Sequence, residues 1–127
     1  MLLSYLERRA AWDRASATSS AGPGDAKWDE LRQQLIAIHA DLCTPGQLSN
    51  RDTSASLPSP RDPSRTSLLD VRWVTDTKVV MITAEDDPLG ILDPQTYEVV
   101  ALLVDTQWRL DERTATYENG TRITGLL

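Results

Sequence analysis

The spacing of hydrophobic residues changes once along this 127-residue chain, and that change constrains its fold more than any other feature. Up to residue 42 the apolar residues recur every three or four positions, whereas after residue 67 they alternate with polar ones. The first period is typical of amphipathic helices and the second of strands. We therefore expect an α+β fold, with N-terminal helices packed on a strongly curved antiparallel sheet, in a single domain over residues 1–127.

Two helices are predicted, over about residues 2–17 and 26–42. The apolar positions of the first are Leu2, Leu3, Tyr5, Leu6, Ala10 and Trp12. The apolar stripe of the second comprises Trp28, Leu31, Leu35, Ile38 and Leu42. Asp29 and Glu30 fall in the first turn of the second helix, where the helix dipole favours acidic residues. Residues 16–25, which contain breakers such as Gly22-Pro23-Gly24, form the predicted linker between the helices.

An irregular, Pro/Ser-rich segment follows over residues 43–67 and contains four prolines. Structureless stretches of this length are uncommon inside compact domains. We expect an ordered excursion over the sheet that has only local structure.

The antiparallel sheet is predicted over residues 68–127. A hairpin begins it, with a tight turn near Asp76-Thr77. After a turn-rich connection at 86–94, the segment "QTYEVVALLVDT" is apolar on both faces, which favours a central strand. Trp108 begins a last pair of strands, which turn at Asn119-Gly120.

The net charge of −6 arises entirely in the C-terminal half of the chain. Residues 67–127 contain eleven acidic and five basic side chains, whereas the charges before residue 67 cancel. Nucleic-acid binding needs a basic face and is therefore disfavoured, and a basic protein partner is the electrostatic expectation. The alternative is that the acidity only keeps the protein soluble.

Targeting features are not recognisable in the sequence. No apolar run approaches the roughly 20 residues that span a bilayer, and the N-terminus lacks the layout of a secretory signal. The one cysteine, Cys43, excludes an internal disulfide and fits a reducing compartment. We expect a cytoplasmic protein without membrane partners, either a monomer or a homodimer.

Candidates for catalysis are few: His39, Tyr97 and Asp105. His39, the single histidine, flanks the apolar stripe of its helix, which also suits a hydrogen-bonded boundary residue. Tyr97 could donate a hydrogen bond within a cavity, and Asp105 could serve as a buried acid or base or be an exposed turn residue. Because no phosphate loop, nucleophile motif or metal-ligand spacing is present, we expect neither cofactor nor metal.

Candidates for partner binding gather in two places. The first is the acidic run Glu85–Asp87, which proline and glycine follow closely, so that ordering it on binding would cost little. The second is the charged side of "WRLDERTATY", where strand alternation separates Trp108 and Leu110 from the charged residues. Its predicted outward residues are Arg109, Asp111, Arg113 and Tyr117. Alternating charges also suit cross-strand ion pairs, which contribute little energy.

This layout resembles the NTF2-like (cystatin-like cone) superfamily, in which the penultimate long strand commonly leads into "G-x-W-R-I". The corresponding residues here are Thr106-Gln107-Trp108-Arg109-Leu110, so the customary glycine is absent. The resemblance covers nearly the whole chain. It implies a cone of curved sheet around helices, which some members use as a catalytic cavity.

A narrower resemblance is to the NTF2-like immunity proteins of bacterial polymorphic toxin systems. The segments that carry it are Trp12-Asp13, "LRQQLIAIHADLCTP" (31–45), "LPSPRDP" (57–63), "LLDVRWVTDTKVVMITA" (68–84) and "YEVVALLVDTQWRLDERTATYENG" (97–120). It implies a non-catalytic protein that binds and neutralises a cognate toxin domain by steric occlusion.

Two other functions stay open from the sequence. One is a small-molecule-binding or isomerase/dehydratase-like enzyme that uses the cone cavity, for which polar groups should converge in a pocket. The other is a dimeric scaffold without ligand, for which the outward face of the sheet should be apolar.

Overall fold

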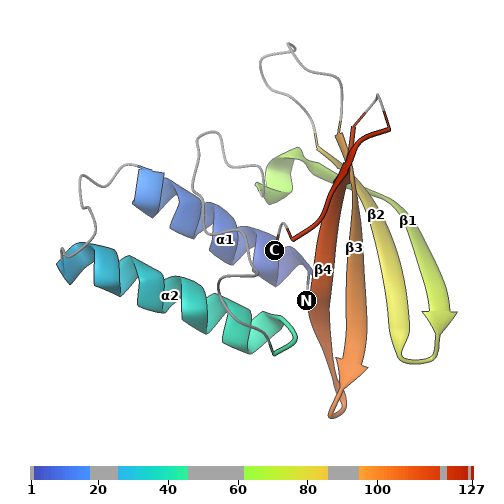
Figure 1. The fold of residues 1–127 in the computed structure, drawn as a ribbon, viewed down its shortest axis with the longest axis horizontal. Helices are drawn as coiled ribbons and strands as arrows, with labels where there is room; N and C mark the ends of the chain where they lie inside the picture. The colour runs from blue at the N-terminus through green and yellow to red at the C-terminus, as the bar shows by residue number, and fades with distance from the viewer. Residues whose placement is uncertain (1, 18–25, 46–61, 86–94, 118–119, 126) are drawn as a thin grey trace.

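The computed structural model describes residues 2–17, 26–45, 62–85, 95–117, 120–125 and 127. Two helices lie on one side of a sheet (Figure 1). They are followed by a short 3-10 helix and five strands. The elements are α1 (Leu2–Ala17), α2 (Ala26–Leu42), η2 (Pro63–Arg65), β1 (Thr66–Thr75), β2 (Lys78–Glu85), β3 (Gln95–Val104), β4 (Gln107–Thr116) and β5 (Arg122–Ile123). The predicted α+β class is confirmed.

The sheet is antiparallel and open, with the strand order β1-β2-β3-β4-β5. Its strands bend along their length (Figure 1). β3 lies at the centre, as expected for a strand that is apolar on both faces. β1 and β2 form the predicted hairpin around Asp76 and Thr77. β1 begins at Thr66, two residues before the predicted start of the sheet.

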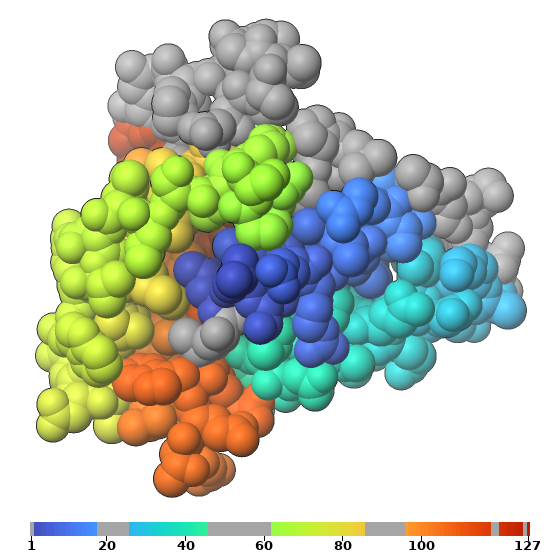
Figure 2. All heavy atoms as spheres, turned by 180° about the vertical axis from the view of Figure 1, so that it is seen from behind, coloured from blue at the N-terminus to red at the C-terminus, as the bar shows by residue number. Residues whose placement is uncertain are grey.

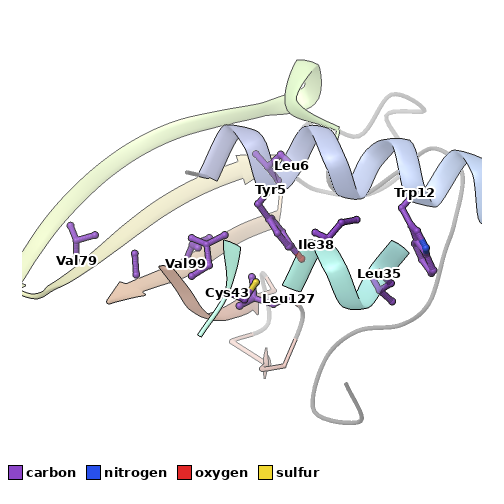
Figure 3. Close-up of a cluster of buried hydrophobic side chains, with 11 residues drawn as sticks. Tyr5, Leu6, Trp12, Leu35, Ile38, Cys43, Val79, Val99 and Leu127 are labelled. Atoms are coloured by element: carbon purple, nitrogen blue, oxygen red, sulfur yellow. The ribbon is translucent and has the colours of Figure 1, made fainter. Parts of the chain in front are cut away.

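The hydrophobic core lies between the helices and the sheet face that they cover, here called the inner face (Figure 3). The strands contribute Val79, Val99, Ala101 and Leu110, and the other core residues are Tyr5, Leu6, Trp12, Leu35, Ile38, Cys43 and Leu127. The side chains of neighbouring positions in a strand point to opposite faces. The residues between these positions therefore form the outer face.

The helices have the predicted bounds, and a buried hydrogen bond joins them. The Trp12 indole Nε1–H donates to the carbonyl oxygen of Leu31 at 2.7 Å. The predicted stripe of α2 is buried at Leu31, Leu35 and Ile38, whereas Trp28 at its N-terminal end is exposed. Trp28 is near the start of α2, and this end of the helix lies away from the sheet (Figure 1).

The segment predicted to be irregular begins by pairing with the sheet. Cys43 forms an isolated parallel bridge with Leu110, and the Thr44 N–H donates to the Leu110 carbonyl oxygen at 2.8 Å. The segment ends in η2, where the Asp62 carboxylate caps the N–H of Ser64 at 2.9 Å. Residues 46–61 and the connection 86–94 lie outside the described residues.

A β-bulge in β4 changes which face its charged residues occupy. Ala101 pairs with Leu110 and Val100 pairs with Glu112, so Asp111 is the extra residue between them. A bulge of one residue reverses the alternation that follows it. Arg113, which pairs with Val99, is consequently on the inner face.

Candidate functional site

Four polar side chains meet at one end of the inner face: Arg65, Glu85, Tyr97 and Arg113. Arg65 comes from η2, and the other three come from adjacent strands β2, β3 and β4. The strand register brings them together, because Tyr97 pairs with Thr83 and Ala115, each two residues from a member of the group. This group is the candidate site.

Glu85 is the centre of the group. Its Oε1 lies 3.2 Å from Nη2 of Arg65, and its Oε2 accepts a hydrogen bond of 3.1 Å from the Tyr97 hydroxyl. The guanidinium carbon of Arg113 lies 3.8 Å from the centre of the Tyr97 ring, which is cation–π geometry. Arg113 is only 4 % exposed. The Glu85 carboxylate therefore holds the guanidinium group of Arg65, and the Tyr97 ring holds that of Arg113.

The environment keeps the Tyr97 hydroxyl protonated. Burial raises the pKa of Tyr97 to about 12; the Arg113 charge opposes this rise, and the Glu85 charge and hydrogen bond add to it. At neutral pH Tyr97 is thus a hydrogen-bond donor and not a base. Because both oxygens of Glu85 have donors, the group joins β2, β3, β4 and η2.

The candidates for a catalytic cavity occupy different places. Tyr97 is in the candidate site, whereas Asp105 is exposed in the turn between β3 and β4. Eight residues of strand separate the two, roughly 26 Å at 3.3 Å per residue. His39 is buried on α2, and its carbonyl oxygen accepts from the Cys43 N–H at 2.9 Å. The structure therefore does not unite the three as one acid/base site.

Arg109 and Asp111 hold α2 to the sheet. Nη1 of Arg109 donates to the carbonyl oxygens at the end of α2, at 2.8 Å for Ala40, 3.2 Å for Asp41 and 3.3 Å for Cys43. The Thr44 hydroxyl donates to Asp111 Oδ1 at 2.8 Å. The charged side of this strand thus binds the chain's own helix end, a role that strand alternation alone does not reveal.

The predicted outward position of Arg113 is wrong, because the bulge at Asp111 turns its side chain onto the inner face. Tyr117 is half-buried at the end of β4, where its N–H donates to the Thr121 carbonyl oxygen. Glu85 ends β2 and is held in the candidate site by Arg65. Asp86 and Asp87 lie outside the described residues.

Sequence reasoning missed Arg65 and a buried ion pair in α1. Arg9 and Asp13 are both fully buried, with Arg9 Nη2 3.7 Å from Asp13 Oδ1. The Arg9 guanidinium also lies 4.9 Å from the centre of the Trp12 ring. The available signal was the spacing of four between Tyr5, Arg9 and Asp13, which places both charges on the buried face.

The outer face of the sheet carries an apolar strip. Strand alternation places there four half-buried side chains, Val80, Ile82, Val100 and Leu102. Two ion pairs lie beside them, Asp70–Arg72 at 3.0 Å and Glu98–Arg122 at 2.7 Å. In the space-filling view from behind, β1 forms the margin of the molecule (Figure 2).

Comparisons with protein-family models, curated proteins and solved structures found no match. Two features do not occur in the part of the chain that the structure describes. Neither helix is long and apolar enough to cross a membrane. Within the same residues, no group of three or more His, Cys, Asp or Glu side chains is arranged to hold a metal ion.

Proposed function

We propose that this chain is a non-catalytic immunity protein, which binds a cognate bacterial toxin domain and neutralises it by covering its active surface. The apolar strip of the outer face supports this proposal; a dimeric scaffold would use the same strip, and the binding test below separates the two functions. Both helices pack on the inner face, and Val80, Ile82, Val100 and Leu102 stay partly exposed on the other side. Apolar surface of this kind, beside charged residues, is typical of a protein-binding site.

The residues around the strip suit the edge of a protein interface. Asp70, Arg72, Glu98 and Arg122 form ion pairs next to it, and Glu112 shares the outer face with Val100. Interfaces commonly have an apolar centre and a polar, solvated rim. The resemblance of the sequence to immunity proteins indicates that the partner is a toxin domain.

The distribution of charge favours a basic toxin surface. Asp76 and Asp105 are exposed in the two turns at one end of the sheet, and the Leu103 N–H joins these turns by donating to the Thr77 carbonyl oxygen at 2.8 Å. Most of the acidic residues lie in the same C-terminal half of the sequence. Complementary charge speeds association and disfavours wrong partners.

The test uses the toxin domain that co-purifies with this chain from a lysate of its source cells. We expect the purified chain to bind it with one-to-one stoichiometry and to restore the growth of cells that express it. Val100→Lys, in the apolar strip, should weaken binding at least about tenfold, because the lysine puts a charge at the interface centre. Leu3→Lys, on the exposed side of α1, is the matched control and should bind normally.

Circular dichroism would establish that both variants are folded. If the folded Val100→Lys variant binds as tightly as the wild type, the outer face is not the binding surface. If the wild-type chain does not bind the toxin domain, the immunity function is wrong.

The alternative is a small-molecule-binding or isomerase/dehydratase-like enzyme. The convergence of Glu85, Tyr97 and Arg113 on the inner face is the observation in its favour. A small molecule retained by the purified chain in native mass spectrometry, and lost in Tyr97→Phe, would favour this alternative.

A further inference from the structure

We propose that β1 pairs with β1 of a second copy of this chain, antiparallel and about a two-fold axis at Val71, so that two five-stranded sheets become one. The proposal goes beyond toxin binding. It uses the edge of the sheet and not its outer face, and its test needs no toxin.

β1 is an exposed edge strand. It ends the strand order, and among the described residues it pairs only with β2. Nine large apolar side chains are exposed among the described residues, and five of them belong to β1. They are Leu68, Leu69, Val71, Trp73 and Val74, of which Trp73 is 66 % exposed. A long, apolar edge presents unpaired backbone groups that another strand can bind.

The backbone of Val71 faces the free edge. In an antiparallel pair, successive residues direct their N–H and C=O groups to opposite sides of the strand. The Val71 N–H donates to Oδ1 of the neighbouring Asp70 at 2.9 Å, so it is not directed at β2. The stretch from Asp70 to Trp73 pairs regularly with β2, between register shifts on either side. The backbone N–H and C=O groups of Val71 therefore face the free edge, in a part of β1 whose pairing with β2 is regular.

The charges beside Val71 are self-complementary. Antiparallel pairing about Val71 places Asp70 of each copy opposite Arg72 of the other, which gives two opposite-charge pairs. Within one chain these side chains already lie 3.0 Å apart, and the hydrogen bonds from Arg72 and the Val71 N–H lower the pKa of Asp70. The carboxylate is thus ionised and can bind Arg72 of the second copy. The freed Val71 N–H would bind the Val71 carbonyl oxygen of that copy.

Neighbouring registers bring like charges together. An axis at Asp70 sets Asp70 against Asp70, and an axis at Arg72 sets Arg72 against Arg72. An axis at Trp73 sets Asp70 against Asp76. Like charges directly opposite one another destabilise strand pairing. Of these four registers, only the one about Val71 matches opposite charges.

The apolar residues follow the same symmetry. In the register about Val71, Leu69 faces Trp73 and Leu68 faces Val74 of the other copy. Cross-strand pairs of aromatic and aliphatic side chains are favourable. Pairing would thus cover the largest group of exposed apolar side chains among the described residues.

Sedimentation equilibrium of the full chain over a range of concentrations tests the proposal, with a dimer of twice 14.1 kDa expected. Asp70→Arg and Arg72→Asp should each weaken dimerisation about tenfold, because each replaces two opposite-charge pairs by like-charge pairs. The double variant with both changes should restore it to within a few fold. The double variant also restores the ion pair within one chain, so variants at Val71 are needed to distinguish pairing between copies from an effect within the monomer.

Two further variants test the position of the axis. Val71→Pro removes the edge N–H while leaving the β1–β2 hydrogen bonds intact, and should give a folded monomer. Val71→Cys should form a disulfide-linked dimer on mild oxidation, because opposed residues in a hydrogen-bonded pair have Cα atoms about 5.5 Å apart. Leu3→Cys on α1 is the control for random cross-linking.

A chain that stays monomeric at all concentrations would overturn the proposal. So would a dimer that neither Val71→Pro nor the single charge reversals weaken. A dimer that the double variant fails to restore would have another register, and would also contradict the pairing proposed.

Discussion

The Tyr97 hydroxyl donates a 3.1 Å hydrogen bond to Oε2 of Glu85, and this contact joins the centre of the sheet to its end. The other oxygen of Glu85 is 3.2 Å from Arg65, on the segment that leads into β1. Tyr97 therefore contacts β2 directly, and Glu85 links it to η2. The contact is buried on the Tyr97 side, where the residue is 5 % exposed.

Removing this hydroxyl should destabilise the fold. Tyr97→Phe keeps the ring beneath Arg113 but deprives the Glu85 carboxylate of one donor, at an expected cost of about 1–2 kcal/mol in the free energy of unfolding. Urea denaturation measures this change in the free energy of unfolding. Tyr117→Phe, at a half-buried tyrosine just after β4, is the control and should cost less. Equal costs for the two variants would show that the Tyr97–Glu85 bond contributes little.

The same residue should make stability depend on alkaline pH. The pKa of Tyr97 is about 12 in the folded chain and near 10 when unfolded. Between these values the folded state holds a proton that the unfolded state has lost, so the free energy of unfolding falls as pH rises. The contribution is complete below about pH 10 and should shrink by on the order of 1–2 kcal/mol towards pH 12.

The measurement is the stability difference between the wild type and Tyr97→Phe, at about pH 9 and at about pH 11.5. Groups that titrate in both proteins cancel in this difference. A difference that is the same at both pH values would mean that Tyr97 titrates normally in the folded chain.

The helices and the strand order were predictable because they depend on periodic burial. The core contains the predicted helical stripe of Leu31, Leu35 and Ile38. It also contains Val79 and Val99, which belong to the predicted strand alternation. The candidate site was not predictable in the same way. Its assembly depends on the cross-strand register and on one extra residue at Asp111, for which the sequence has no distinct signal.

Strained backbone in the β3–β4 turn gives a third prediction. Asp105 and Thr106 have φ values of 49° and 67°, the left-handed conformation that two-residue type I′ turns require. A β-branched residue is disfavoured there, whereas glycine is not.

Thr106→Gly should therefore stabilise the chain, by about 1 kcal/mol in the free energy of unfolding. Thr77→Gly, in the turn between β1 and β2, is the control, because no positive φ occurs there. It should be neutral or destabilising. Destabilisation by Thr106→Gly would mean that the turn is not strained by its threonine.

Arg109 should contribute more to the free energy of unfolding than a residue in an exposed ion pair does. Its guanidinium binds three carbonyl oxygens at the helix C-terminus, where positive charge is favoured. Arg109→Ala should cost about 1–3 kcal/mol and speed amide hydrogen exchange near Cys43. Arg122→Ala, which breaks the exposed pair with Glu98, should cost less than about 1 kcal/mol. Unchanged exchange at Cys43 would contradict the role given to Arg109.

The Arg9–Asp13 pair should show strong non-additivity because both side chains are fully buried. Asp13→Leu leaves the guanidinium in the core without its carboxylate partner, at an expected cost of about 3–5 kcal/mol. Adding Arg9→Met removes the buried charge, so the double variant should be more stable than Asp13→Leu alone. Glu30→Ala, which breaks the exposed Lys27–Glu30 pair, should cost under about 1 kcal/mol. Urea denaturation of the wild type, Asp13→Leu, Arg9→Met and the double variant closes the cycle, and additive costs would show that the two buried charges do not depend on each other.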